Sequence, residues 1–231
     1  MDSRKEVFDK AIVVEFPLRG EWISPNTPGK RIPSHGTDKF GQRYAYDFMQ
    51  VDSGKKIFKE NQLKYFFGKI PLRSCYCWGK EVYSPCNGRI IEAMDGFSER
   101  QYLQFFKDII TVIKNTKSFD PERQGIQTIA GNYIVMECGK DIYAFFAHFQ
   151  RNSITVKTGE EIKKGQIIGK VGHTGNSTAP HLHFQLMDNV DPIKANGIPC
   201  VFEKIEIFEG NCWRIIQKGI PSDKDIIRFN G

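Results

Sequence analysis

The sequence has no long apolar run and no leader-like N-terminus. None of its apolar runs approaches the roughly 20 residues that a membrane-spanning helix requires, so we expect no membrane span. The residues that follow Met1, up to Glu6, are polar or charged, and no apolar h-region comes after them. We therefore expect either a cytoplasmic protein or one whose secretory leader has been removed.

Cysteine is sparse and irregularly placed. The six cysteines stand at positions 75, 77, 86, 138, 200 and 212. Cys75 and Cys77 are closer together than the C-x2-C spacing of a zinc knuckle, and no second such pair follows. We therefore expect reduced thiols, mostly buried, and this favours a reducing compartment.

Charge of either sign is not gathered in one tract. The chain has 33 Lys and Arg against 27 Asp and Glu, a net charge of +6, and the lysines look scattered. We therefore expect no nucleic-acid partner, because such partners need a basic patch with interleaved aromatic residues. An anionic cell envelope or membrane surface is compatible with the charge, and so is a charge that only keeps the protein soluble.

Glycine and aromatic residues, by contrast, are abundant. The 231 residues include 21 glycines and 18 phenylalanines, and 40% of the chain is hydrophobic, which is enough for a core and argues against disorder. Short apolar runs between turn residues predict a β-rich fold. Predicted strands lie at residues 11–16, 44–51, 81–93 (two strands joined by an Asn-Gly turn), 132–138, 142–149, 163–172, 180–186 and 201–208. Residues 98–117 have a period near 3.6 instead and predict an inserted helix.

The most informative stretch is Pro180-His181-Leu182-His183-Phe184-Gln185-Leu186. In a strand, His181 and His183 point to one face, while the apolar residues between and after them face a core. Neutral imidazole is the commonest metal ligand among side chains, so the pair is a candidate metal site. Two histidines on a solvated sheet face are the alternative, and the motif alone does not decide between them.

Three other residues suit the same chemistry. Asp47 interrupts an apolar run, where an ion pair, an edge position or a metal ligand would each explain it. His35 lies in a loop-like stretch, and His148 lies near the end of a predicted strand. Imidazole and carboxylate groups are the ligands of catalytic zinc sites, which have three protein ligands and one open position.

Several segments resemble one family. They are Tyr143 to His148, Gly159 to Gly169, and the run Gly-His-Thr-Gly-Asn-Ser-Thr-Ala-Pro-His-Leu-His-Phe that ends at Phe184. Together with Ser84-Pro85-x-x-Gly88-x-Ile90, they are similar to the lysostaphin-type zinc endopeptidases, peptidase family M23. The similarity runs from about residue 35 to 190.

The resemblance implies a role for each candidate residue. His183 matches a zinc ligand, and Asp47 matches the aspartate ligand. His181 and His148 match catalytic histidines beside the metal, which orient or deprotonate a water and steady the developing oxyanion. The resemblance also implies a mainly β fold with an antiparallel β-sandwich core of the duplicated hybrid motif type, and Zn2+ as cofactor.

The first histidine ligand departs from the family pattern. A histidine usually stands four residues before the aspartate, but position 43 is arginine here. Either His35 reaches the metal from the longer loop with Asp47 as its partner, or His35 and Asp38 form a compressed His-x-x-Asp pair. We favour the first interpretation, because residues 44–48 have strand character and Asp38 lies among polar loop residues. If neither holds, the metal lacks a ligand and the enzyme is inactive.

The fifth histidine, His173, occupies a variable loop position in the matching motif. We expect it to be exposed to solvent, with a contact to substrate as the alternative.

The zinc chemistry predicts hydrolysis of a peptide bond by a metal-activated water. The resemblance implies that the substrate is the stem peptides or cross-bridges of bacterial peptidoglycan. A non-catalytic scaffold of the same fold, which binds peptidoglycan or activates another hydrolase, is the alternative. A phosphocarrier-like domain is a third possibility, disfavoured because it would not need a His-x-His motif together with Asp47.

We expect a single domain over residues 1–231. Its predicted additions to the family core are an N-terminal extension 1–30, an insertion near 97–130 and a C-terminal extension near 190–231. The predicted walls of the site groove are loops 24–42, 97–130 and 172–180.

Overall fold

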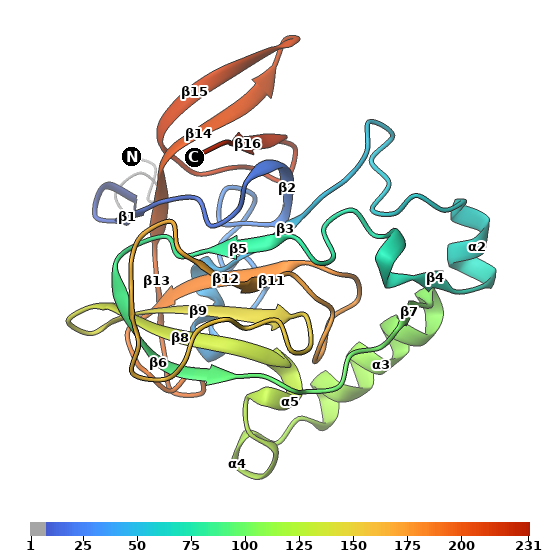
Figure 1. The fold of residues 1–231 in the computed structure, drawn as a ribbon, viewed down its shortest axis with the longest axis horizontal. Coiled ribbons are helices and arrows are strands. Elements are labelled where there is room, and N and C mark those ends of the chain that lie inside the picture. The colour runs from blue at the N-terminus through green and yellow to red at the C-terminus, as the bar shows by residue number, and fades with distance from the viewer. Residues whose placement is uncertain (1–7) are drawn as a thin grey trace.

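A large, mostly antiparallel sheet forms the body of the molecule. The structure is a computed structural model and describes residues 8–231, apart from the side chains of Gln62 and Glu122 (Figure 1). The strands along the sheet, in spatial order, are β1 (Ile12–Val14), β14 (Cys200–Glu209), β16 (Ile227–Phe229), β2 (Gly20–Asn26), β3 (Tyr46–Met49), β12 (Leu182–Met187), β9 (Ile142–Phe149), β8 (Asn132–Gly139), β6 (Gly88–Met94) and β10 (Glu161–Ile162). In addition, β13 (Gly197–Ile198) pairs with β12, and β15 (Cys212–Gly219) pairs with β14.

Smaller elements surround this sheet. Two further two-stranded sheets pair β5 (Glu81–Tyr83) with β11 (Ile167–Lys170), and β4 (Ile70–Pro71) with β7 (Tyr102–Leu103). The helices are η1 (Lys39–Tyr44), α2 (Gln62–Phe67), η2 (Leu72–Ser74), α3 (Phe105–Ser118), α4 (Pro121–Gln124) and α5 (Gln127–Ala130). No helix in the described part of the chain is long and apolar enough to cross a membrane.

The core lies between the large sheet and the β5–β11 pair. Val82 of β5 and Ile168 of β11 belong to the same buried cluster as Ile90, Phe146 and Phe184 of the large sheet. Burial of both layers against one another removes their apolar faces from water, which is the main favourable term in folding. The mainly β fold with a sandwich-like core and an inserted helical segment is therefore confirmed.

The segments that carry Phe16 and Phe202, near the start and toward the end of the described chain, pack into this same core. The ring of Phe16 meets that of Phe48 at a centroid distance of 4.9 Å and that of Phe202 at 5.1 Å, both edge to face. Such contacts add to the apolar area that each ring buries. The proposed limits of the N-terminal extension, the insertion and the C-terminal extension stay a prediction, and residues 1–7 of the first lie outside the described residues.

The central position of β12 sets the site. It pairs with β3 on one side, with His183 opposite Asp47, and with β9 on the other, with His183 opposite Ala147. Directly opposed residues of an antiparallel pair lie on the same face of the sheet, so this register brings His183 and Asp47 together.

The predicted Asn-Gly hairpin over residues 81–93 is wrong. β5 and β6 do not pair with each other, because β5 joins β11 and β6 joins β8 and β10. A two-residue hairpin of this kind needs a positive φ at both turn residues, and Gly88 has none. Asn87 instead accepts a hydrogen bond from the backbone N–H of Lys164, and the chain passes from one layer to the other.

The predicted helix over residues 98–117 begins later than expected. Tyr102 and Leu103 form β7, and α3 starts only at Phe105. Asp108 explains the start, since its carboxylate accepts the Gln104 backbone N–H at 2.7 Å and so satisfies one of the free donors of the first turn. The aromatic and apolar residues before it belong to the strand.

Gly172 allows the loop before β12 to approach β9. A Cβ added at Gly172 would lie 2.2 Å from the backbone nitrogen of Gln150, and the Gly172 N–H donates to the His148 carbonyl at 2.9 Å. We predict that Gly172→Ala lowers the free energy of unfolding by about 1–3 kcal/mol, because two backbone segments must separate. Urea unfolding measures this change.

Gly139→Ala is the matched control. Its added Cβ would meet only the Cδ1 atom of Ile142 at 3.6 Å, an ordinary contact, and Gly139 has no positive φ. We expect this variant to unfold at nearly the wild-type urea concentration. Equal stability of the Gly172 and Gly139 variants would contradict the close approach.

Candidate metal centre

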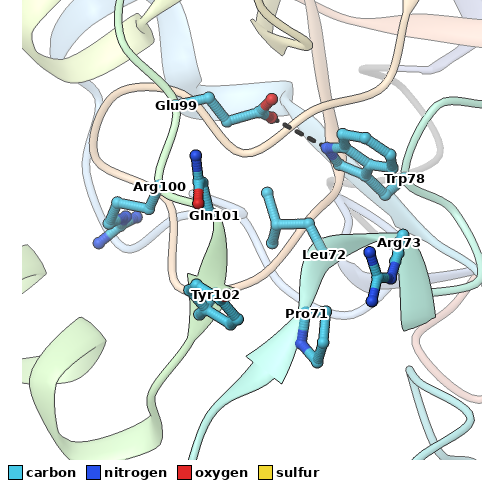
Figure 2. Close-up of a pocket in the computed structure, with 8 residues that line it drawn as sticks. All are labelled: Pro71, Leu72, Arg73, Trp78, Glu99, Arg100, Gln101 and Tyr102. Carbon is cyan, nitrogen blue, oxygen red and sulfur yellow. Dashed lines mark hydrogen bonds between the residues drawn. The ribbon is translucent and has the colours of Figure 1, made fainter.

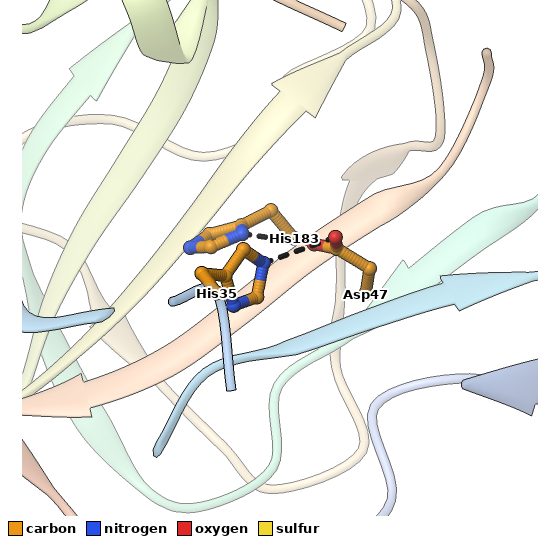
Figure 3. A group of neighbouring side chains, drawn as sticks. All are labelled: His35, Asp47 and His183. Carbon is orange, nitrogen blue, oxygen red and sulfur yellow. Dashed lines mark hydrogen bonds and ion pairs between the residues drawn. The ribbon is translucent and has the colours of Figure 1, made fainter. Parts of the chain in front are cut away.

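Two histidines converge on one buried carboxylate (Figure 3). The His35 Nε2 atom lies 3.0 Å from Asp47 Oδ2, and the His183 Nδ1 atom lies 2.9 Å from Asp47 Oδ1. The possible ligand atoms of these three residues all lie within 4.8 Å of one another. The three residues thus offer two imidazole nitrogens and a carboxylate at one point, which is a donor set typical of zinc.

His35 reaches this point from the loop between β2 and η1. The loop is held by Ser34, whose backbone N–H donates to the Arg43 carbonyl and whose hydroxyl donates to the Gln42 carbonyl. Asp38, the alternative partner, has a side chain that is 62% exposed and pairs with Arg43 at 2.6 Å. The structure therefore brings Asp47 to His35 and leaves Asp38 at the surface.

Hydrogen bonds on the far side of each ring orient the ring nitrogens. His183 Nε2–H donates to the Gln185 side-chain oxygen at 3.0 Å, and the Gln185 amide donates in turn to the Phe40 carbonyl at 2.7 Å. His35 Nδ1–H donates to the Ser34 hydroxyl at 3.0 Å. In the neutral rings these bonds leave lone pairs on His183 Nδ1 and His35 Nε2, both aimed at Asp47.

Such an arrangement suits a cation. Lone pairs of two rings and a carboxylate repel one another unless a proton or a metal ion lies between them. Burial acts to raise the pKa of the Asp47 carboxyl. The positive charge of His35 and His181 when protonated, and hydrogen bonds from protonated His183 and His35, outweigh burial and hold that pKa well below its ordinary value. Asn26 also donates to Asp47 Oδ2 at 2.8 Å. The carboxylate is therefore ionised at neutral pH, as a metal ligand must be.

Two further histidines stand beside this group. The ring centroids of His148 and His181 lie 4.6 Å apart, and His181 Nε2 lies 3.5 Å from Asp47 Oδ1. His148 Nδ1–H donates to the Thr174 carbonyl at 2.9 Å, and His181 Nδ1–H donates to the Ala179 carbonyl at 2.8 Å. In the neutral form of both rings Nε2 therefore carries the lone pair and can accept a proton.

His148 is buried and uncharged. Burial lowers its pKa well below the ordinary value, and the nearby His181 and His183 rings lower it further. A neutral imidazole at neutral pH can accept a proton, which is the requirement for a general base. The structure thus brings together all five predicted site residues, while the role of each stays a prediction.

The expectation that His173 is exposed is wrong. Its side chain is buried, and its Nδ1–H donates to the Ser177 hydroxyl at 3.0 Å. Ser177 donates to the Ala179 carbonyl, which also accepts from His181. His173 therefore lies behind the site and supports the loop that orients His181, rather than facing solvent or substrate.

Glu99 supports the same loop and lines a separate pocket, in which its carboxylate faces Trp78 (Figure 2). Its carboxylate accepts the His173 backbone N–H at 2.7 Å and the Trp78 indole N–H at 3.1 Å. Sequence reasoning missed the supporting roles of Glu99, Ser177 and Gln185. Glu99 stands in no motif, whereas Ser177 and Gln185 lie within the segments quoted above. Gln185 could have been found by its spacing, since it stands two residues after a predicted ligand on the same strand face.

A groove of about 510 Å³ opens onto the group. The three predicted wall loops all contribute to its lining. The residues that line it are Asn26, His35, Thr37, Lys39, Phe40, Gln42, Asp47, Val112, Thr116, Phe119, Pro121, Ile129, His148, Asn176, Thr178, His181 and His183. The predicted groove and its walls are therefore confirmed.

Fold and site together define a mainly β protein with a candidate metal centre beside two further histidines. The sequence model of peptidase family M23 matches residues 76–195, and the chain belongs to this family. The match includes His148, His181 and His183 but begins after His35 and Asp47.

Relatives in this family match parts of the chain. The chain is 39% identical over 66 residues to peptidoglycan DD-endopeptidase ShyA of Vibrio cholerae serotype O1, covering 29% of this chain and 15% of that protein. It is 37% identical over 87 residues to lysostaphin of Staphylococcus simulans, covering 38% of this chain and 18% of that protein. The solved catalytic domain of lysostaphin from Staphylococcus simulans aligns with a TM-score of 0.37 at 21% identity, covering 84% of this chain and 93% of that chain.

The buried His173 predicts a pH dependence of stability. Burial and the charge of Arg100 lower the pKa of His173 from 6.5 to about 2. Below pH 6.5, His173 therefore binds a proton in the unfolded chain but stays neutral in the folded chain. Stability is therefore lost as the pH falls below 6.5. We predict that His173→Asn, which can keep a donor toward Ser177, loses about 2 kcal/mol less than the wild type between pH 7.5 and pH 5.

The measurement is urea unfolding of both proteins in the presence of a chelator, so that metal release does not contribute. The difference between wild type and variant isolates His173 from the other buried histidines. Parallel curves of unfolding free energy against pH for the two proteins would mean that folding does not lower the pKa of His173.

Proposed function

We propose that the chain is a zinc-dependent endopeptidase. The observation that carries the proposal is the convergence of His35 Nε2, His183 Nδ1 and the Asp47 carboxylate at the floor of the groove. These residues fit zinc because the second ring nitrogens of His35 and His183 are already hydrogen-bonded, to Ser34 and Gln185, and Asn26 donates to Asp47. The atoms that can still bind a metal therefore face one point.

The metal would supply one part of the chemistry. Bound zinc lowers the pKa of a water toward about 7 and polarises a carbonyl oxygen. His35, Asp47 and His183 would hold it. The remaining tasks of peptide hydrolysis, which are to move a proton and to stabilise the charge that develops on the carbonyl oxygen, fall to residues of the chain.

His148 and His181 are placed for these tasks. His148 is neutral and can accept a proton at Nε2, because its Nδ1–H is fixed on the Thr174 carbonyl. His181 has the same tautomer, fixed by the Ala179 carbonyl, and its Nε2 faces Asp47. One of the two would take the proton from the attacking water at Nε2 and return it to the leaving amine. The other would steady the oxyanion in its protonated form, by donating Nε2–H to it.

The peptide part of bacterial peptidoglycan is the proposed substrate. The relatives named above include a peptidoglycan DD-endopeptidase, and the chain spans less than a fifth of the length of the relatives compared. The groove offers apolar contacts from Val112, Phe119 and Ile129 alongside the polar groups of Asn176 and Thr178. This mixture suits an extended peptide with short side chains, such as a stem peptide or a cross-bridge.

Metal content and cleavage test the proposal together. We expect the wild type to hold about one zinc per chain and to cleave purified peptidoglycan, and His183→Ala to lose both, because one of three ligands is gone. Mass spectrometry of the metal and chromatography of the released peptides measure the two properties. Gly139→Ala, far from the ligands, serves as the matched control.

Two results would decide against it. A wild-type protein without bound zinc would remove the metallopeptidase proposal. A wild type that holds zinc but cleaves no wall substrate would favour the scaffold that binds peptidoglycan or activates another hydrolase.

The two histidines beside the centre make a separate prediction. We expect His148→Ala and His181→Ala to keep zinc but to reduce kcat by about 10²–10⁴-fold, because positioned proton transfer contributes a factor of this size. Turnover of a synthetic stem peptide at saturating zinc measures the loss. Loss of zinc in either variant would instead make that histidine a ligand.

A further inference from the structure

Two helical segments, one of which lines the groove, leave apolar side chains exposed. Among the described residues, twelve large hydrophobic side chains are exposed, and seven of them lie in residues 55–75 and 102–118. We call these seven the α2–α3 face. They are Leu63, Phe66, Phe67, Tyr102, Phe106, Ile110 and Ile113.

The face is continuous across two helices. Phe106, Ile110 and Ile113 are spaced by four and three residues and so form one stripe along α3. Phe105 joins α3 to α2 through ring contacts with Tyr65 at 5.2 Å and Phe66 at 4.9 Å. Figure 1 shows both helices together at one side of the molecule, away from the β14–β15 hairpin.

The same two segments account for the net positive charge of the chain. Residues 55–75 contain six Lys and Arg and one Glu, a net charge of +5, and residues 102–118 contain three Lys and one Asp, a net charge of +2. Their total exceeds the +6 of the whole protein, so the rest of the chain is slightly acidic. Nine of the 33 Lys and Arg lie in these two segments and the others are scattered along the chain, as expected, but the two segments, 27 residues apart in sequence, adjoin in space.

Local acidic groups do not cancel this charge. Asp108 is buried and pairs with Arg100 at 3.0 Å, and Glu60 pairs with Lys64 at 3.0 Å. Lys107, Lys114 and Lys117 of α3 are exposed. Apolar side chains and exposed lysines thus share one surface.

We propose that the α2–α3 face binds the surface of a bilayer that contains anionic lipids. Helices with lysines around a Phe- and Ile-rich stripe lie in the plane of such an interface, where the apolar side chains enter the acyl boundary and the ammonium groups reach the phosphates. Attraction to anionic lipid contributes about 1 kcal/mol per lysine near the surface.

A bilayer explains both halves of the surface. An anionic polymer would attract the lysines but would leave Phe67, 85% exposed, and Ile110, 64% exposed, in water. A protein partner would have to match an apolar stripe with an acidic rim, whereas an anionic bilayer offers an apolar layer and negative phosphates at once.

The surface also connects to the groove. α3 contributes Val112 and Thr116 to the groove lining, and Asn176 donates to the Thr116 hydroxyl at 3.0 Å. Membrane binding through the outer stripe of α3 would therefore hold the groove beside the lipid surface. The binding itself does not rest on the proposed catalysis, because none of the seven residues belongs to the candidate metal centre.

Vesicle sedimentation tests the proposal with the full chain. The wild type is mixed with vesicles of phosphatidylcholine alone, or of phosphatidylcholine with 30% phosphatidylglycerol, at about 0.1 M salt. We expect partition into the anionic vesicles and at least tenfold weaker partition into the neutral ones. Raising the salt to about 0.5 M should weaken the binding, since it screens the lysines.

Two sets of variants separate the contributions. We expect the triple variant Lys107→Gln, Lys114→Gln, Lys117→Gln to weaken partition about 100-fold, and Phe106→Ser with Ile110→Ser to weaken it at least tenfold. Phe208→Ser with Ile215→Ser, exposed apolar residues outside the face, is the matched control and should bind as the wild type does. Circular dichroism and melting establish that each variant is folded.

Three outcomes would overturn the proposal. The first is no partition of the folded wild type into anionic vesicles. The second is binding to heparin as strong as to vesicles and unaffected by the Phe106 and Ile110 substitutions, which would indicate an anionic polymer. The third is a concentration-dependent dimer in light scattering that these two substitutions abolish without any lipid binding, which would indicate a second copy of the chain.

Discussion

The pairing of Asp47 with His183 across β3 and β12 is the contact on which the site depends. It places a carboxylate and an imidazole 2.9 Å apart inside a sheet, where neither would be stable without the other. Because the register of an antiparallel pair alternates faces with every residue, a slip by one position would send Asp47 into the core. The apolar neighbours Phe48 and Phe184 oppose such a slip, since they are fully buried on the other face.

A second constraint is the control of ring tautomers by groups that do not touch the centre. Gln185 fixes His183, and the carbonyls of Thr174 and Ala179 fix His148 and His181. The loop that carries those carbonyls is itself supported by buried polar contacts. The orientation of the histidine rings is thus set by the loop before β12 as much as by the strand. A buried polar network beneath that loop keeps its carbonyls in place.

The sequence predicts much of this site because its signals are local. The alternation around His181 and His183 marks a strand, and an acidic residue within an apolar run marks Asp47 as paired. The partner of His35 is harder to predict, since no periodicity governs a loop. The contact of His35 with Asp47 and the exposure of Asp38 in the structure separate the two interpretations. The burial of His173 escapes prediction because burial of a loop residue depends on segments distant in sequence, here the one that carries Glu99.

The same limit explains the errors in the fold. Asn87-Gly88 has the composition of a tight turn, yet the partners of β5 and β6 lie far along the chain and override it. The start of α3 depends on one capping carboxylate rather than on the apolar period. Charge shows the limit most clearly, because two lysine-bearing segments that look unrelated in sequence adjoin through Phe105. α3 consequently faces two environments, with Val112 toward the groove and Ile113 toward solvent, so that one helix borders both the groove and the basic surface.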